Sequence, residues 1–497
     1  MQPTSPLRMT GETVLEQIAK KIKTLEAKKN RLLCEAAGVD QEIKLAWAIH
    51  GKLLNQNAPI SCLPNEMLAM IFMACQQLWL QKSYSRSFEV VASHVSSHWR
   101  DVATGTPLLW STIHVHVRRR EYRAKNLERL SMYLARSDTC PLVITLKIHE
   151  EIFPFLDLLT PHVDRWSRLS VTTRRLDELN VHLYSLSPLI LEHLSLCLEE
   201  KSHLPGAGTE TMHDDFPKIF SGGAPCLGFV RVSGIAICCL RPPLTSVTTL
   251  HIDHATMDNL SHVRLQTMLR ASPLLTNLSL FGVANEPTTI SAPINTPNLR
   301  SLRVSGNSAS VYRLLSTLWS PQLESLVLQA IDTFDWQFSI VFPVLHSLAL
   351  NDCILLESEA KQFFRAFSAL THFQCGASDL NILRLLGLKN ADLGLPSNDL
   401  PWPNLVTLSV KELAPPEVSP FCDMIANRKA LGQPLTQLRL DRRTRTVLRH
   451  KGRLDGVREL VKVENWDHID TWPVGLGYTD DGDFFWQNHW IFDICPL

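Results

Sequence analysis

The chain has 497 residues, of which 45% are hydrophobic and 20% are charged, values typical of a folded globular protein. Lysine and arginine together number 49, as do aspartate and glutamate, so the formal net charge is zero. A protein that binds nucleic acid through its overall field usually carries a basic excess, which this chain lacks. At ~150 residues per domain, the length suits roughly three domains or one long array of repeats.

Signals for membranes, secretion and metals are missing from the sequence. No apolar run approaches the ~20 residues that span a bilayer, and the first residues lack the charged-then-apolar layout of a signal peptide. No two of the twelve cysteines have the two-residue separation of zinc knuckles and thioredoxin-like sites. We therefore expect a cytoplasmic or nuclear protein with no membrane contact, metal or cofactor.

Residues 1–11 are expected to form a disordered tail, and residues 12–57 an amphipathic, coiled-coil-like helix. Apolar side chains recur there at steps of three and four, or their sums: Ile18, Ile22, Leu25, Leu32, Val39, Ile43 and Leu53. Lys29 and Gly38 weaken this heptad-like seam. Two interpretations stay open, a short coiled coil that forms a homodimer and one or two helices packed on the neighbouring domain.

Residues 59–111 are predicted to form a small all-helical domain. Pro64 and Glu66 suit the first turn of a helix, where a missing N–H costs nothing and a negative charge is favoured. One apolar stripe is expected to follow along this helix, at Met67, Ile71, Cys75 and Leu78, with Leu68 and Phe72 beside it. After a polar break, a second helix is predicted to carry Val91, Val95, Trp99 and Val102 on one face, with Trp99 mostly buried.

Fixed spacings in this domain indicate a family. Leu-Pro-Asn-Glu at 63–66 precedes Leu68 and the pair at 71–72, and Val-x-x-x-Trp-Arg-Asp-x-Ala follows at 95–103. The arrangement resembles the F-box of fungal, basidiomycete-type proteins, with Thr-Pro-Leu-Leu-Trp at 106–110 as its tail; Ala92 and Ser96 depart from it. F-box helices bind the adaptor that links them to a cullin. The resemblance therefore implies adaptor-binding residues at Leu63, Pro64, Glu66, Leu68, Ile71, Phe72, Val95 and Trp99.

After a predicted linker helix at 112–139, the phrase Leu-x-x-Leu-x-Leu recurs through residues 140–465. Its lead leucines at 275, 299, 323 and 345 are 24, 24 and 22 residues apart, within the leucine-rich-repeat range. The phrase resembles the leucine-rich repeats that commonly follow an F-box. We therefore expect an α/β fold in which N-terminal helices and a helical F-box precede a leucine-rich-repeat-like solenoid with a parallel β-sheet. The solenoid should be irregular, because the usual asparagine ladder is mostly absent.

Alternation along each strand fixes which side chains enter the core. The inward set is Leu302, Val304, Leu326, Leu328, Leu348, Leu350, Leu408 and Val410. Their neighbours should line a shallow, open surface without one dominant charge, and solenoids bind partners along such a face. The residues predicted to bind substrate there are Ser301, Arg303, Ser325, Gln329, Ser347, Asn351, Thr407 and Lys411.

Residues 466–497 are rich in Trp and Phe. We interpret them as a cap over the open end of the solenoid, with a partner-binding patch as the alternative. Asp480–Asp483 is expected to be a solvated turn, and the pairs His251/His254 and His114/His116 to be surface histidines, since no third metal ligand accompanies either pair.

No nucleotide-binding motif, nucleophile elbow or paired-acid site occurs, so no enzyme activity is expected. The F-box resemblance implies a substrate-recruiting subunit of a cullin–RING ubiquitin ligase, which binds the adaptor through its F-box and an unidentified protein substrate through its repeats. The alternative is a non-catalytic repeat scaffold unconnected to ubiquitin, in which the F-box-like helices serve only as an N-terminal cap.

Overall fold

The computed structural model divides the chain into two compact units, Met1–Trp110 and Ser111–Leu497. The residues that it describes are 11–56, 58–80, 87–117, 119–149, 151–174, 176–198, 219–233, 240–253, 260, 262–283, 293–331, 342–354, 360–376, 380–389, 400–466 and 472. Residues 1–10 of the expected tail, His254, Asp480–Asp483 and the C-terminal segment apart from Trp466 and Trp472 lie outside the described residues.

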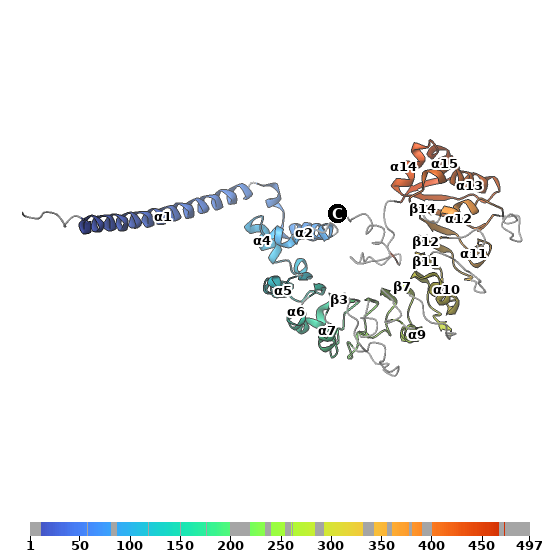
Figure 1. The fold of residues 1–497 in the computed structure, drawn as a ribbon, viewed down its shortest axis with the longest axis horizontal. Coiled ribbons are helices and arrows are strands. Elements are labelled where there is room, and N and C mark those ends of the chain that lie inside the picture. The colour runs from blue at the N-terminus through green and yellow to red at the C-terminus, as the bar shows by residue number, and fades with distance from the viewer. Residues whose placement is uncertain are drawn as a thin grey trace, which may run out of the picture. The chain divides into compact units, whose positions relative to one another are not determined.

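The first unit is helical. Its α-helices are α1 (Gly11–Gln56), α2 (Asn65–Leu80), α3 (Phe88–Ser93) and α4 (Ser97–Thr104), with short 3-10 helices η1 (Pro59–Cys62) and η2 (Pro107–Trp110). Helix α1 runs unbroken for 46 residues, and every residue from 15 to 50 is exposed. The apolar residues of the predicted seam lie along this exposed surface of the helix. Figure 1 shows α1 as a single long helix.

The second unit is built on one 14-stranded sheet in which every strand pairs in parallel with the next strand of the order. Its strands are β1 (Thr112–Val117), β2 (Leu142–Ile148), β3 (Trp166–Thr173), β4 (His193–Leu198), β5 (Phe229–Ser233), β6 (Thr249–Asp253), β7 (Asn277–Val283), β9 (Ser301–Gly306), β11 (Ser325–Gln329), β12 (Ser347–Asn351), β13 (His372–Cys375), β14 (Thr407–Val410), β15 (Gln437–Leu440) and β16 (Lys462–Asn465). The strand order follows the sequence, and among the described strands β8 (Ile294–Asn295) and β10 (Leu318–Trp319) form a separate pair.

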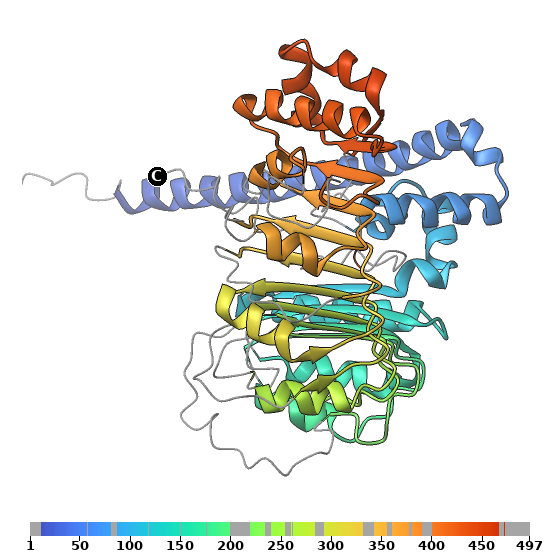
Figure 2. The ribbon, with the colours of Figure 1, turned by 90° about the vertical axis from the view of Figure 1, so that its right-hand side faces the viewer.

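Helices return between the strands of this unit. The α-helices described here are α5 (Arg123–Arg136), α6 (Phe153–Leu159), α7 (Leu176–Leu183), α9 (His262–Arg270), α10 (Ser308–Thr317), α11 (Ala360–Ala366), α12 (Leu380–Leu385), α13 (Val418–Ala430), α14 (Arg442–His450) and α15 (Leu454–Leu460). The 3-10 helices are η3 (Arg120–Tyr122), η4 (Thr160–Arg165) and η7 (Pro415–Glu417). Figure 1 shows the sheet following an arc with these helices on its outer side, and Figure 2 shows the strands stacked one above another. The inner face of the arc is hereafter the concave face.

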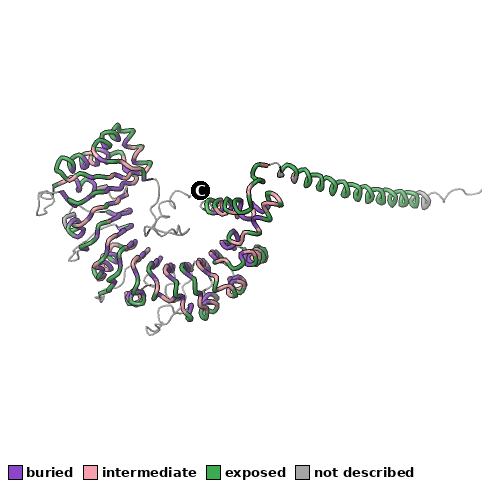
Figure 3. Tube along the Cα trace, turned by 180° about the vertical axis from the view of Figure 1, so that it is seen from behind, coloured by how far each residue is buried: buried purple, intermediate pink, exposed green. Residues whose placement is uncertain are grey.

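The predicted strand register is confirmed. Leu278, Leu302, Leu326 and Leu348 occupy one pairing row across β7, β9, β11 and β12. All eight side chains expected to point inward are buried, so the leucine phrases build one continuous core. Figure 3 shows the buried residues gathered along the strands of the arc.

The sheet begins earlier than predicted. Residues 112–139 were expected to be a linker helix, but β1 occupies Thr112–Val117 and pairs with β2, and α5 covers only the later part. The reason is a plain alternation, because Ile113, Val115 and Val117 are buried while His114 and His116 between them are exposed. Among the described helices, none is long and apolar enough to cross a membrane.

Candidate functional site

The inner face of α2 organises the helical unit. Leu68 and Phe72 are buried, and the Phe72 ring lies 4.9 Å from the ring of Trp99 and 6.0 Å from that of Phe88, measured between centroids. Gln76, one turn further along, donates through Nε2 to the Leu109 carbonyl at 2.8 Å. Helix α2 therefore packs on α3, α4 and η2 through this face.

The apolar stripe predicted along α2 faces solvent, apart from the half-buried Cys75. Met67, Ile71 and Leu78 are 48%, 38% and 62% exposed, and Met70 beside them is also exposed. Gln76 is polar in the sequence pattern, yet its hydrogen bonds allow it to be buried on the opposite, inner side of α2. Met67, Met70, Ile71 and Leu78 form a second apolar side of the helix, hereafter the α2 outer face.

The second helix predicted for this unit, which was expected to carry Val91 to Val102, is divided into two helices, α3 and α4. Helix α3 ends at Ser93, and α4 begins after Ser96, whose hydroxyl accepts a hydrogen bond from the Trp99 backbone N–H at 3.1 Å. A serine in this position is a good N-cap, so the chain restarts a helix there. As a result Val95 lies in the turn and is exposed, and Trp99 is half-buried rather than mostly buried.

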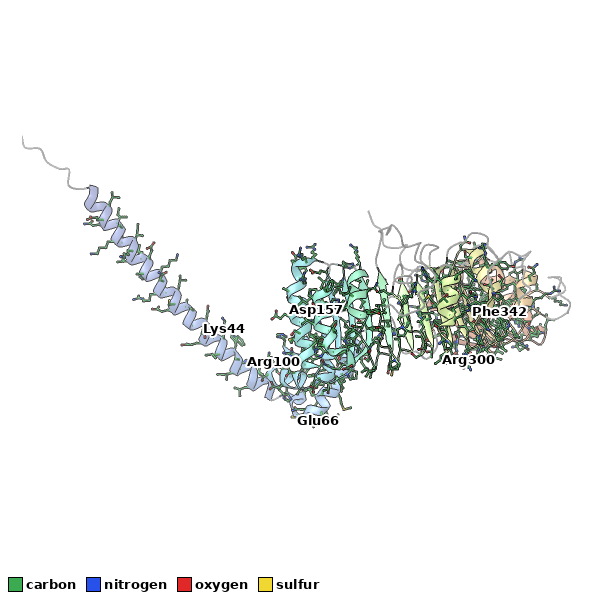
Figure 4. The ribbon with its side chains drawn as sticks, turned by 90° about the horizontal axis from the view of Figure 1, so that it is seen from below. Lys44, Glu66, Arg100, Asp157, Arg300 and Phe342 are labelled. Carbon is green, nitrogen blue, oxygen red and sulfur yellow. The ribbon has the colours of Figure 1, made fainter. Side chains whose placement is uncertain are left out.

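The structure separates the predicted adaptor-binding residues into two groups. Leu68 and Phe72 belong to the core of the helical unit. Pro64, Glu66, Ile71 and Val95 are exposed, and Leu63 and Trp99 are half-buried. Pro64 stands just before α2, where its carbonyl accepts the Leu68 N–H at 3.1 Å. Figure 4 labels Glu66 on α2 and Arg100 on α4. Sequence reasoning missed Met70, which is exposed on the α2 outer face at a helical step from Met67.

The concave face is less open than the sequence predicts. Ser301, Ser325 and Ser347 form one half-buried row across β9, β11 and β12, and Lys411 is also half-buried. The other predicted substrate-binding residues are buried: Arg303, Gln329, Asn351 and Thr407. On the inner side of a curved sheet the side chains converge, and even Val327 and Ala349 are buried there.

A polar cluster lies on the same face, on β4, β5, β6 and β9. It was not predicted from the sequence. Its members are His193, Phe229, Arg231, His251, Asp253 and Arg303, hereafter the arginine–histidine cluster; all six are buried. Arg231 donates through Nε to the Asp253 carboxylate, and the His193 ring stacks on Phe229 at 4.1 Å between centroids. Side chains up to four strands apart thus meet on one surface.

Arg303 and His251 are the centre of this cluster. The Nε of Arg303 donates to Ser279 Oγ at 2.7 Å, and its Nη2 donates to His251 Nδ1 at 3.4 Å. Burial, together with the nearby Arg303, Arg231 and His193, holds the pKa of His251 well below its ordinary value. His251 is therefore neutral, and its Nδ1 accepts from Arg303. This buried position corrects the expectation of a surface histidine for His251.

Two tryptophans near the end of the chain contact cations of the concave face. The Trp472 ring lies 4.5 Å from the Arg303 guanidinium carbon and 5.5 Å from the His251 ring centroid. The Trp466 ring lies 4.1 Å from Lys411 Nζ, and its backbone N–H donates to the Leu440 carbonyl at 2.9 Å. Trp466 thus lies beside the ends of β14 and β15, whereas Trp472 lies beside residues of β6 and β9.

In the described part of the chain, no group of three or more His, Cys, Asp or Glu side chains is placed to hold a metal ion. Comparison of the sequence with protein-family models and with curated proteins found no match.

Proposed function

We propose that this protein is a non-catalytic, substrate-recruiting subunit of a cullin–RING ubiquitin ligase. In this proposal α2, α3 and α4 are an F-box that binds the adaptor, and the second unit is an irregular leucine-rich-repeat solenoid that holds a protein substrate. The observation that carries the proposal is the α2 outer face, which stands directly after the F-box-like phrase at 63–66.

The α2 outer face has the properties of an interface core. Its four side chains are each about half exposed, and burying the remaining surface is worth about 1 kcal/mol per side chain. Gln76 and Phe72 hold the opposite side of α2 against the rest of the unit, so the outer face is presented on a fixed helix. A rigid apolar helix face of this kind favours a protein partner with a complementary groove.

The second unit supports the substrate-holding role. Parallel strands in sequence order, with helices between them and leucines in one continuous row, are the expected features of a leucine-rich solenoid. Such a subunit breaks and forms no bond. It accelerates ubiquitin transfer by raising the local concentration of a substrate lysine near the charged conjugating enzyme.

We also propose that α1 pairs with the same helix of a second copy. Residues 18, 22, 25, 32, 39, 43 and 53 fit one heptad register, and those of them in the range 18–43 are among the exposed apolar side chains. An exposed apolar seam along so long a helix is typical of a coiled-coil strand. A dimer would place two substrate-holding units in one complex.

The deciding experiment is capture of the recombinant full chain by the purified adaptor–cullin complex. Wild type should bind, and Ile71→Arg should lower the affinity at least thirtyfold, since removing a central apolar anchor costs about 2 kcal/mol or more. The matched control is Gln77→Arg, an exposed position at the side of the same helix, which should bind like wild type. Failure of the folded wild-type chain to bind would favour the repeat scaffold unconnected to ubiquitin.

A further inference from the structure

The concave face presents a cation to each of two aromatic side chains of the chain's own C-terminal segment. Trp472 lies over Arg303, and Trp466 lies over Lys411. Stacking of a cation on an aromatic ring is strongest where the cation is shielded from water, and Arg303 is only 1% exposed. Arg303 therefore provides a desolvated surface for a flat aromatic ring.

Neighbouring side chains of the sheet hold Arg303 in place. Its guanidinium group donates to Ser279 Oγ and His251 Nδ1, and its carbon lies 4.5 Å from the centroid of the Trp472 ring. His251 is itself packed against the Phe229 ring, with 4.7 Å between centroids. A site with fixed side chains loses little conformational entropy on binding, which favours specific recognition.

Charge favours an acidic ligand. Within the arginine–histidine cluster, as the structure describes it, Arg231 and Arg303 carry two positive charges and Asp253 one negative charge, while His251 is neutral. The segment that contains Trp466 and Trp472 is complementary, because residues 466–497 include six aspartates and neither lysine nor arginine. The composition of this segment is thus of the acidic and aromatic kind that the cluster favours.

The two cations also define a spacing. Arg303 is in β9 and Lys411 follows β14, four strands along the sheet order. At ~4.8 Å per strand this separation is about 19 Å, and six extended residues span about 20 Å. Two aromatic residues six positions apart, as Trp466 and Trp472 are, fit both cations in an extended peptide.

The present occupant is not an ideal one. The indole N–H of Trp472 and the Nε2 of His251 are both buried, and neither has a hydrogen-bond partner among the residues described. A buried donor without an acceptor weakens the contact in which it takes part. A peptide that supplies a hydrogen-bond acceptor to His251 Nε2, which Trp472 does not do, would displace Trp472.

We propose that the concave face at Arg303 and His251 is a binding site for an acidic peptide with an aromatic residue, and that Trp472 is its intramolecular occupant. Trp466, six positions before Trp472, stays on Lys411, so the peptide has to displace only Trp472. Where the peptide belongs to the recruited substrate, this inference rests on the proposed ligase function; the site itself does not. Trp472 of the chain itself then competes with the substrate, so only a peptide that binds more tightly than Trp472 is recruited.

A direct test uses a fluorescent peptide with the sequence of residues 464–475 and the full-length protein. Trp472→Ala should bind this peptide at least tenfold more tightly than wild type, because the intramolecular competitor is gone. The double variant Trp472→Ala with Arg303→Gln should bind the peptide at least tenfold more weakly than Trp472→Ala alone. The matched control is Arg439→Gln in the same background, which removes an equal charge from the same row of the sheet on β15 and should change binding less than twofold.

Equal binding by wild type and Trp472→Ala would overturn the inference, as would equal effects of Arg303→Gln and Arg439→Gln. If the buried Arg303→Gln variant fails to fold, the same contact is tested from the other side with a peptide that has Ala at position 472, which should bind at least tenfold more weakly. The adaptor is not needed for this measurement. Peptide binding without adaptor capture would therefore refute the ligase function and leave the site intact.

Discussion

Gln76 and Glu89 join α2 to α3 inside the helical unit, where the Nε2 of Gln76 donates to Glu89 Oε2 at 3.1 Å and both side chains are buried. The same Nε2 donates to the Leu109 carbonyl of η2. One amide therefore connects three elements of the unit. The apolar pattern of the sequence does not place this polar side chain inside the unit. Its hydrogen bonds fix which face of α2 points inward and which face is left for a partner.

Gln76→Ala should lower the free energy of unfolding of the helical unit by about 2–3 kcal/mol, since two buried hydrogen bonds are lost and buried polar groups lose a partner. The measurement is denaturant unfolding of the full chain followed by far-UV circular dichroism. Gln77→Ala on the exposed side should stay within about 0.5 kcal/mol of wild type. Equal stability of the two variants would show that the buried amide is not structural.

Trp99→Ala should cost about 2 kcal/mol, less than for a fully buried tryptophan, because the ring is half-buried against Phe72. The fluorescence-detected unfolding midpoint of the full chain measures this loss. Val95→Ala, in the exposed turn between α3 and α4, serves as control and should be nearly neutral. A larger effect at Val95 than at Trp99 would contradict the packing of α4.

Coiled-coil pairing of α1 predicts opposite effects at two neighbouring seam positions. Leu25→Lys should make the full chain monomeric in sedimentation equilibrium, because it places a charge in the apolar interface. Lys29→Ile should tighten the dimer at least tenfold, since it replaces a charge with an apolar side chain at the next seam position. A molecular mass of one chain for wild type and both variants at all concentrations would refute pairing.

Acid should destabilise the second unit through His251. Its pKa is lowered in the folded state, so the unfolded chain binds the proton more readily, and stability falls as the pH drops below the unfolded value near 6.5. The expected loss is up to ~1.4 kcal/mol per pH unit until the folded pKa is reached. The charged and titratable groups that act on this ring are Arg303, Arg231 and His193, and Arg231 is itself bonded to Asp253.

His251→Asn retains an acceptor for Arg303 but does not titrate, so it should flatten the dependence of stability on pH between 6.5 and 5. Unfolding midpoints of wild type and the variant in buffers across this range provide the measurement. Parallel slopes for the two proteins would mean that other groups dominate the acid response.

The residues that were predictable are those governed by local periodicity. Leu326 and Leu348 were placed correctly in the core because alternation along a strand decides their side. The break at Ser96 and the inward turn of Gln76 were not predicted, since each depends on a hydrogen bond that the apolar pattern does not contain. The arginine–histidine cluster was beyond reach because Arg303 and His251 are 52 positions apart and meet only through strand register.

The consecutive order of the strands fixes the spacing between side chains on different strands of the sheet. Arg303 and Lys411 are separated by a whole number of strands, so the distance between them changes only in steps of ~4.8 Å. Duplication or loss of one strand–helix unit between β9 and β14 would move the two cations apart or together by one step, equivalent to one or two residues of an extended ligand. Gene-level gain or loss of a unit would thus reset the preferred spacing of aromatic residues without altering either cation.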